Sequence, residues 1–191
     1  MRRRKPSPGE PNTRDQILGA AQQIAASRGA GHVTLDAVAR ESGLSKGGVL
    51  YHFPNKDALI NGMLERLIER NAAAREALEQ SLTDRPYSIL RAMMHARMPE
   101  HRALNPDVAM AVLAAAAEKP QLLEPMREHI RQLYERIVDQ HKDGDLDLAL
   151  LLWATADGLL FQDLLALSPL DPDHRQRLDR RLLALTEELL S

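Results

Sequence analysis

The sequence predicts an all-α protein of about nine helices, and three observations favour this fold class. Leucine and alanine dominate the chain, and aromatic residues make up only 3% of it; such a composition favours helices over strands. Apolar residues recur at spacings of three and four, the period of an amphipathic helix. We find neither the alternating pattern of a strand nor an internal repeat. With 191 residues, the chain can bury a core in one large domain or two small ones.

Composition also excludes several classes of site. The chain has no cysteine, which excludes disulfides and thiolate metal sites. The N-terminus begins with Arg2, Arg3, Arg4 and Lys5, but no apolar run follows, so it is not a secretory signal. The longest apolar stretches are far shorter than the roughly 20 residues of a membrane span. We therefore expect a cytoplasmic protein with no membrane partner, no metal and no cofactor.

The charges are distributed unevenly. Residues 1–56 hold nine Lys/Arg and four Asp/Glu, whereas the remaining 135 residues hold sixteen and twenty-three. A basic first third on an acidic body suggests that the first third meets a polyanion. Four of the nine cations lie in residues 2–5, however, so chance together with a basic tail would explain the same asymmetry.

The first helices can be placed from caps and breakers. Residues 1–11 are basic and rich in Pro and Gly, and we expect them to be disordered. Thr13 and Gln16 match a capping box and begin an amphipathic helix that ends near Gly29. A fourth helix is expected from Asn55 to about Leu82. Further helices are expected near residues 87–97, 106–118, 121–141, 146–167 and 173–190, between prolines and glycines.

Between these lies a helix-turn-helix pattern. Thr34 and Ser45 are suitable caps for two short helices, and the residues "ESGLS" separate them. Gly43 suits the left-handed conformation that a tight turn needs. Val49 and Phe53 are apolar and would hold the second helix against its neighbours. An αα-hairpin without a DNA role has the same spacing, so the pattern alone leaves both interpretations open.

The stretch "VTLDAVARESGLSKGGVLYHFPNKDALI", residues 33–60, closely resembles the DNA-binding segment of the TetR family of transcriptional regulators. The resemblance is specific over about residues 13–64 and continues as architecture over the rest. It implies a helix-turn-helix DNA-binding domain at 12–56 and, joined to it through the long fourth helix, a helical effector-binding and dimerisation domain at 57–191. It also implies a homodimer on a palindromic double-stranded DNA operator, most often a repressor, that a small-molecule effector releases.

The resemblance makes the helix from Ser45 to Phe53 the recognition helix. One feature departs from the family pattern: Leu50 stands where a tyrosine is common, and leucine cannot hydrogen-bond to a base. Base recognition would then rest more on Lys46, on close backbone approach at the glycines and on DNA shape. The caps and His52 also have purely structural interpretations. The predicted DNA contacts are Thr34, Ser45, Lys46, Gly47, Gly48, Leu50, Tyr51, His52 and Lys56.

The helix at 146–167 is apolar on nearly all sides, and a helix without a wide polar face is buried on several sides. The final helix carries leucines at a 4-3-4 spacing, which is typical of helix–helix packing. A partner chain is the simplest cover for both helices, although two core helices of a monomer would show the same pattern. The predicted dimer interface consists of Trp153, Leu160, Leu164, Leu178, Leu182, Leu185 and Leu189.

The effector site is expected among helices four to eight. Methionine adapts to ligands of different shape, and Met and Trp side chains together with Asp157 favour a bulky apolar or cationic ligand. Each of these residues has an ordinary core or surface role as its alternative. The predicted ligand contacts are Met94, Met98, Met110, Leu113, Trp153, Asp157 and Phe161.

An enzyme is the main rival class, and the sequence disfavours it. No His-Glu-x-x-His is present, no two histidines lie at i and i+4, and no Gly-rich phosphate loop follows a strand. We therefore expect no catalytic residues. A helical adaptor whose helix-turn-helix contacts other proteins remains a second rival.

Overall fold

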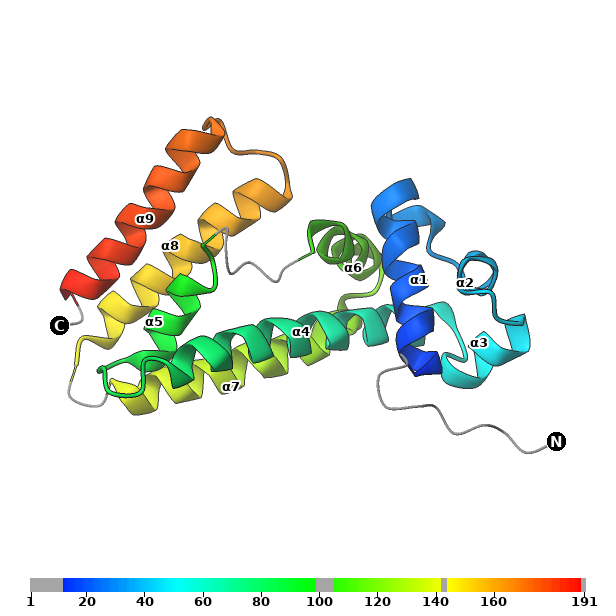
Figure 1. Ribbon diagram of the computed structural model, residues 1–191, viewed down its shortest axis with the longest axis horizontal. Coiled ribbons are helices and arrows are strands. Elements are labelled where there is room, and N and C mark those ends of the chain that lie inside the picture. Colours follow the sequence, from blue (N-terminus) through cyan, green and yellow to red (C-terminus); the bar gives the residue numbers. More distant parts are fainter. Residues whose placement is uncertain (1–11, 99–104, 142–143, 190–191) are drawn as a thin grey trace. The chain divides into compact units, whose positions relative to one another are not determined.

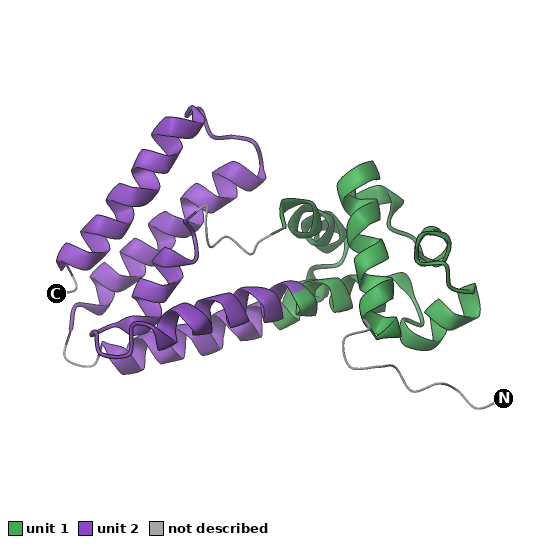
Figure 2. Ribbon diagram, viewed as in Figure 1, with its two compact units in different colours: residues 1–66, 105–125 green, residues 67–104, 126–191 purple. Residues whose placement is uncertain are grey.

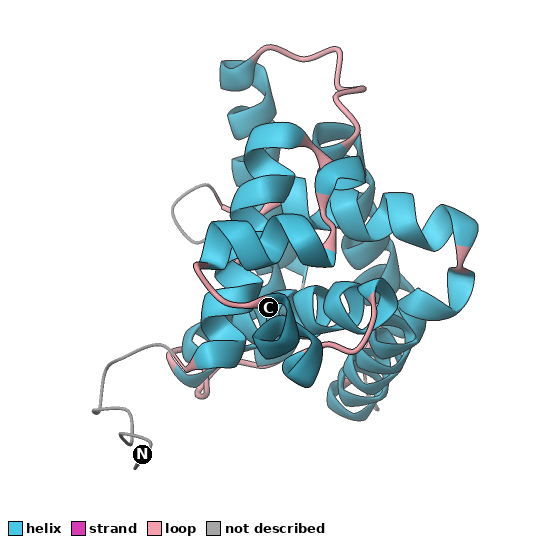
Figure 3. Ribbon diagram, turned by 90° about the vertical axis from the view of Figure 1, so that its right-hand side faces the viewer, coloured by secondary structure: helices cyan, strands magenta, loops and turns pink. Residues whose placement is uncertain are grey.

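A computed structural model describes residues 12–98, 105–141 and 144–189. These residues form nine α-helices and two short 3₁₀ helices, and they contain no strand (Figures 1 and 3). The predicted all-α fold is confirmed. The helices are α1 (Thr13–Arg28), η1 (Ala30–His32), α2 (Leu35–Ser42), α3 (Lys46–His52), α4 (Lys56–Gln80), α5 (Ser88–His95), α6 (Pro106–Glu118), η3 (Pro120–Leu123), α7 (Glu124–Gln140), α8 (Leu146–Leu164) and α9 (Pro172–Leu189).

The chain forms two compact units, coloured separately in Figure 2. The first comprises residues 1–66 and 105–125, and the second comprises residues 67–104 and 126–191. The long helix α4 contributes to both, and α6 packs with the N-terminal helices rather than with α7 to α9. The division by function at residue 57 stays a prediction, and the predicted disordered tail lies outside the described residues.

Side-chain caps begin the helices of the first unit. Thr34 Oγ1 accepts a hydrogen bond from the Ala37 N–H at 3.1 Å, and Ser45 Oγ accepts one from the Gly48 N–H at 3.1 Å. Both predicted caps are confirmed. The predicted Thr13 cap is wrong by one residue, because Asn12 caps α1 and Thr13 is already helical. Both residue types are good caps, so local sequence does not decide between them.

The turn between α2 and α3 has the geometry that its glycine allows. Gly43 has φ +70°, a left-handed conformation that costs glycine little. The Leu44 N–H donates to the Ala39 carbonyl at 3.1 Å, and the Gly43 N–H donates to the Arg40 carbonyl at 3.4 Å. These two bonds form a Schellman motif, which satisfies carbonyls at the end of α2 and sets the direction of α3.

Helix α3 is held by its buried side. Val49 is fully buried and Phe53 is 3% exposed. A Cβ atom on Gly62 of α4 would lie only 2.6 Å from Cε1 of Phe53 and 3.3 Å from Cδ2 of Leu18. The missing side chain at Gly62 therefore makes the space into which the Phe53 ring packs, and this contact fixes the end of the α3 segment against α1 and α4.

The second unit has one main apolar core, to which α5, α7, α8 and α9 contribute. Trp153 and Leu159 pack against it from the rim. None of the described helices has the length and apolar character that crossing a membrane requires. The buried core residues are Ile89, Leu90, Met93, Met94, Leu133, Ile137, Ala149, Leu152, Ala156 and Leu182.

The packing of Gly62 predicts opposite effects for two glycine-to-alanine changes. Gly62→Ala gains about 1 kcal/mol of helix propensity but forces the buried Phe53 ring to move, which costs about 1–3 kcal/mol. We expect a net loss of stability. Gly19→Ala in α1 meets no atom within 4 Å and should stabilise by about 1 kcal/mol. Urea denaturation measures both, and equal stabilisation by the two changes would contradict the packing described.

Candidate nucleic-acid interface

Helix α3 separates its buried residues from its exposed ones. Val49 and Phe53 face the core, whereas Lys46 and Gly47 are exposed and the exposed fraction of Tyr51 is 81%. A tyrosine has a large apolar ring and a hydroxyl that can donate a hydrogen bond, and here the protein itself covers neither. The outer face of α3 is therefore available to an external partner.

Lys46 does not extend freely into solvent. Its ammonium lies 2.9 Å from Oδ1 of Asp36, an ion pair that joins the first turns of α3 and α2. Both side chains are more than half exposed, so the pair contributes little to stability. It matters more for the predicted contact with DNA, because the carboxylate would compete with phosphate for the ammonium. Asp36 was not predicted from the sequence, since the two residues are ten positions apart and only the turn brings them together.

The remaining predicted contacts lie at the ends of α2, α3 and α4. Thr34 and Lys56 are exposed, and Lys56 is the first residue of α4, where Asn55 Oδ1 accepts a hydrogen bond from the Ala58 N–H at 2.8 Å. His52 is half-buried, and its ring meets the Tyr51 ring edge to face at 5.1 Å. Leu50 is 36% exposed. Thr34 thus lies at the start of α2, Leu50 and His52 lie in α3, and Lys56 begins α4.

The two adjacent glycines of α3 differ in their surroundings. A Cβ atom on Gly47 would meet nothing within 4 Å, whereas a Cβ atom on Gly48 would lie 3.3 Å from the capping Oγ of Ser45. Packing within the protein therefore explains the glycine at position 48. It does not explain the glycine at position 47, although Gly47 weakens the helix by about 1 kcal/mol relative to alanine.

Many cations of the first unit are already paired with carboxylates. Arg14 binds Glu65 at 2.8 Å and lies over the Phe53 ring, and Arg28 lies 3.6 Å from Glu41. Residues 1–11 hold four Lys/Arg and one Glu, and residues 12–56 hold five Lys/Arg and three Asp/Glu. Residues 1–11 therefore contribute three of the five net positive charges of the first third, and the helix-turn-helix contributes two.

The structure divides the predicted effector residues between the two units. Met110 and Leu113 are half-buried on α6 in the first unit. Met94 lies in the core of the second unit and Trp153 packs against that core, whereas Phe161 is 49% exposed. The other two also belong to the second unit: Met98 is buried and Asp157 is half-buried.

Asp157, the charge on which the preference for a cationic ligand rested, has a partner of its own. Its carboxylate accepts a hydrogen bond from the guanidinium of Arg97. A cation binding at Asp157 would have to displace that arginine or share the carboxylate with it.

The predicted dimer residues also differ in exposure. Leu182 is enclosed by the core of its own unit and Leu189 is 50% exposed, while the other five are half-buried. The exposed side of α8 carries Leu151 and Phe161, with exposed fractions of 65% and 49%, and Leu165 follows the end of the helix directly with 45%. Leu151 and Leu165 were not predicted from the sequence, because a helix that is apolar on nearly all sides has no wide polar face to mark its outside.

Two family models match the chain. The model for bacterial regulatory proteins of the tetR family covers residues 17–63, which include α2, α3 and the start of α4. The model for the tetracyclin repressor-like C-terminal domain covers residues 87–187.

Curated relatives point to the same class of protein. The transcriptional regulator BetI of Stenotrophomonas maltophilia is 25% identical over 133 residues, which cover 69% of this chain and 68% of BetI. The nucleoid occlusion factor SlmA of Aliivibrio fischeri is 29% identical over 138 residues, covering 71% of this chain and 68% of SlmA.

Solved structures have the same fold. A transcriptional regulator from Rhodococcus sp. Rha1 superposes with a TM-score of 0.69 at 24% identity, covering 93% of this chain and 98% of that one. The multidrug binding protein EbrR complexed with ethidium gives 0.62 at 23% identity, with 90% and 98% covered. The class is one of regulators, not of enzymes, and with a C-terminal model that spans more than half of its length, this chain belongs to the TetR family of DNA-binding transcriptional regulators.

Proposed function

We propose that the protein is a cytoplasmic homodimeric repressor that binds a palindromic operator and leaves it when a small molecule binds the second unit. The observation that supports this most is the division of α3, whose buried face is anchored by Val49 and Phe53 while its outer face presents Lys46 and Tyr51. A two-fold dimer would place two such helices in successive major grooves.

In the proposed complex the outer face of α3 enters the major groove and the flanking residues bind phosphates. Lys46 has three donors on its ammonium, so it can keep its contact with Asp36 and still reach a base or a phosphate. Lys56 and Thr34 would bind the backbone on either side. The proposed contacts are Thr34, Ser45, Lys46, Gly47, Gly48, Leu50, Tyr51, His52 and Lys56.

The proposed dimer uses the exposed side of α8 together with α9. The exposed positions are large at Leu151 and Phe161 of α8 and at Leu165 directly after it, and they are small at Ala154 and Gly158 between the first two. Small residues in the middle of a helix face allow a second helix to approach closely. Leu189 extends the surface on α9, together with the half-buried Leu160, Leu164, Leu178, Leu185 and Trp153; Leu182 is left out, because its own core encloses it.

The proposed effector site lies in the second unit, which the tetracyclin repressor-like C-terminal model matches. EbrR, which has the same fold, was solved with ethidium bound, so a protein of this fold can hold a small organic molecule. Met94, Met98, Trp153, Asp157 and Phe161 remain candidates there. Met110 and Leu113 lie on α6 in the first unit and are left out of the proposed site.

Lys56→Ala should weaken operator binding and reduce its salt dependence. A lysine that neutralises one phosphate releases about 0.9 counterion, so the slope of log K against log salt should become shallower by about 0.9. Fluorescence anisotropy with a duplex that the wild-type protein selects from a random library measures this. Arg131→Ala is the control, because Arg131 lies on α7 of the second unit, where it binds Glu128 and Glu135, and the change should leave the slope unchanged. If the wild-type protein selects no sequence, the regulator proposal fails and the adaptor alternative gains.

Gly47→Ala should make the protein more stable and a poorer DNA binder. The added methyl group meets open space in the free protein, so Tm should rise by about 2–4 °C. In the complex the same methyl group would separate the α3 backbone from DNA, and we expect affinity to fall about tenfold. Melting curves and anisotropy measure the two effects, and an unchanged affinity would show that Gly47 does not approach DNA.

Leu151→Glu should dissociate the dimer. The substitution places a carboxylate without a partner in the proposed interface, and burying such a charge is costly. Sedimentation velocity at micromolar concentration should give a dimer for the wild-type chain and a monomer for Leu151→Glu. Ile130→Glu on α7 is the matched control, since Ile130 is 46% exposed but outside the proposed interface, and it should remain a dimer. A dimeric Leu151→Glu would place the interface elsewhere.

A further inference from the structure

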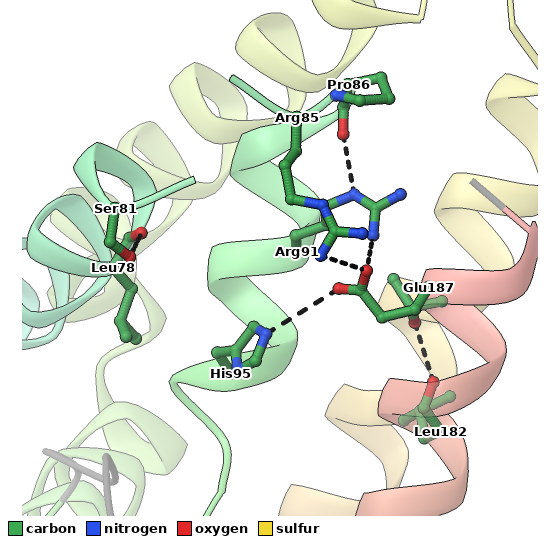
Figure 4. A network of polar contacts seen from close by, with 9 residues as sticks. Leu78, Ser81, Arg85, Pro86, Arg91, His95, Leu182 and Glu187 are labelled. Carbon is green, nitrogen blue, oxygen red and sulfur yellow. Dashed lines mark hydrogen bonds and ion pairs between the residues drawn. The ribbon is translucent and has the colours of Figure 1, made fainter. Parts of the chain in front are cut away.

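The second unit contains a buried arginine with one donor atom that has no hydrogen-bond partner. Arg75 on α4 is only 7% exposed, and its Nε has no hydrogen-bond partner. Arg91 on α5 is the useful comparison, because it is also buried. Its Nε donates to the Pro86 carbonyl at 2.9 Å and its Nη1 donates to Glu187 (Figure 4). Buried arginines normally have such partners, so the lack of a partner at Nε of Arg75 requires an explanation.

Of the two carboxylates near Arg75, one binds another arginine and the other is exposed to solvent. Glu79 lies one turn further along α4, but both of its oxygens accept hydrogen bonds from Arg136 of α7, at 2.9 and 2.8 Å. Glu76 is exposed to solvent. Burial, and after it the nearby charge of Arg136, lowers the pKa of Arg75, against the opposing charges of Glu76 and Glu79. Arginine nevertheless stays protonated at physiological pH, so the buried charge persists.

His129 on α7 is close enough to feel the charge of Arg75. His129 on α7 is half-buried, and its pKa is lowered by burial and then by the charge of Arg75, against the opposing effect of Glu76. It is therefore neutral at physiological pH, with one ring N–H to donate. His129 lies at i−4 and i−8 from Leu133 and Ile137, which belong to the apolar core. His129 thus lies on the same helix as two residues of the apolar core, one and two turns away from them.

We propose that Arg75 is the anion-binding group of the effector site and that the effector is an organic carboxylate with an apolar body. The planar fork of a guanidinium matches the two oxygens of a carboxylate, the His129 ring can donate one more hydrogen bond, and the apolar body would lie against the core. This inference rests on the proposed function, which it deepens by naming the class of ligand. It reverses the preference for a cation, whose basis, Asp157, is already paired with Arg97.

The first test measures whether the buried charge of Arg75 destabilises the ligand-free protein. Arg75→Met removes the charge and keeps a long side chain, and it should leave Tm of the ligand-free protein unchanged or raise it by about 2–4 °C. Arg91→Met is the matched control, and it should lower Tm because it leaves Glu187 without its buried partner. If Arg75→Met lowers Tm as Arg91→Met does, Arg75 is a structural residue and the proposal is wrong.

The second test uses three probes that share one apolar body: octanoate, octanol and octylammonium. At millimolar concentration octanoate should raise Tm of the wild-type protein, the other two should not, and the rise should disappear in Arg75→Met. NMR titration adds a local measurement, because a bound carboxylate screens Arg75 and should raise the pKa of His129. Absence of an octanoate effect, equal effects of the three probes, or an effect that persists in Arg75→Met would each overturn the proposal.

The experiments distinguish failure of the Arg75 assignment from failure of the proposed regulator function. Wild-type protein that selects a DNA sequence but fails the octanoate test leaves the regulator proposal intact and removes only the assignment of Arg75. Wild-type protein that selects no DNA sequence refutes the regulator proposal whatever octanoate does. Release of the selected duplex by octanoate from the wild-type protein, but not from Arg75→Met, would support both.

Discussion

The contact between Phe53 and Gly62 is the constraint on which the helix-turn-helix depends. Helix α3 has seven residues, two of them glycine, and a helix this short and this weak in propensity does not persist alone in water. Its cap at Ser45 and its buried Val49 hold the first turns. The Phe53 ring holds the end, and it fits only because Gly62 has no side chain. The position of α3, whose outer face is exposed to solvent, is thus determined mainly by buried residues.

The two units use buried polar and apolar groups differently. In the first, polar groups close helix ends and turns, and the ion pairs of Arg14, Arg28 and Lys46 involve partly exposed side chains. In the second, Arg91 and Glu187 join α5 to α9 inside the unit, while Arg75 remains without a partner at Nε. Under the proposal made for Arg75, this donor is kept for a ligand, and its burial without a partner costs stability.

Features that depend on local sequence could be predicted, and features that depend on distant contacts could not. The helices, the caps at Thr34 and Ser45 and the turn at Gly43 follow from neighbouring residues, because caps and turns are local hydrogen-bonding patterns. The Asp36–Lys46 pair, the space made by Gly62 and the isolation of Arg75 all arise from packing. The exposed face of α8 could not be predicted for another reason, because apolar residues occur on nearly every side of this helix.

The pairing of cations in the helix-turn-helix bears on how a regulator searches a genome. Non-specific association with DNA is driven by phosphate neutralisation, and residues 12–56 carry a net charge of only +2, with Arg14, Arg28 and Lys46 engaged in ion pairs. Outside residues 1–11, such a surface attracts unrelated DNA weakly. Discrimination between a correct site and its many competitors then depends more on the fit of the helix-turn-helix than on its overall charge.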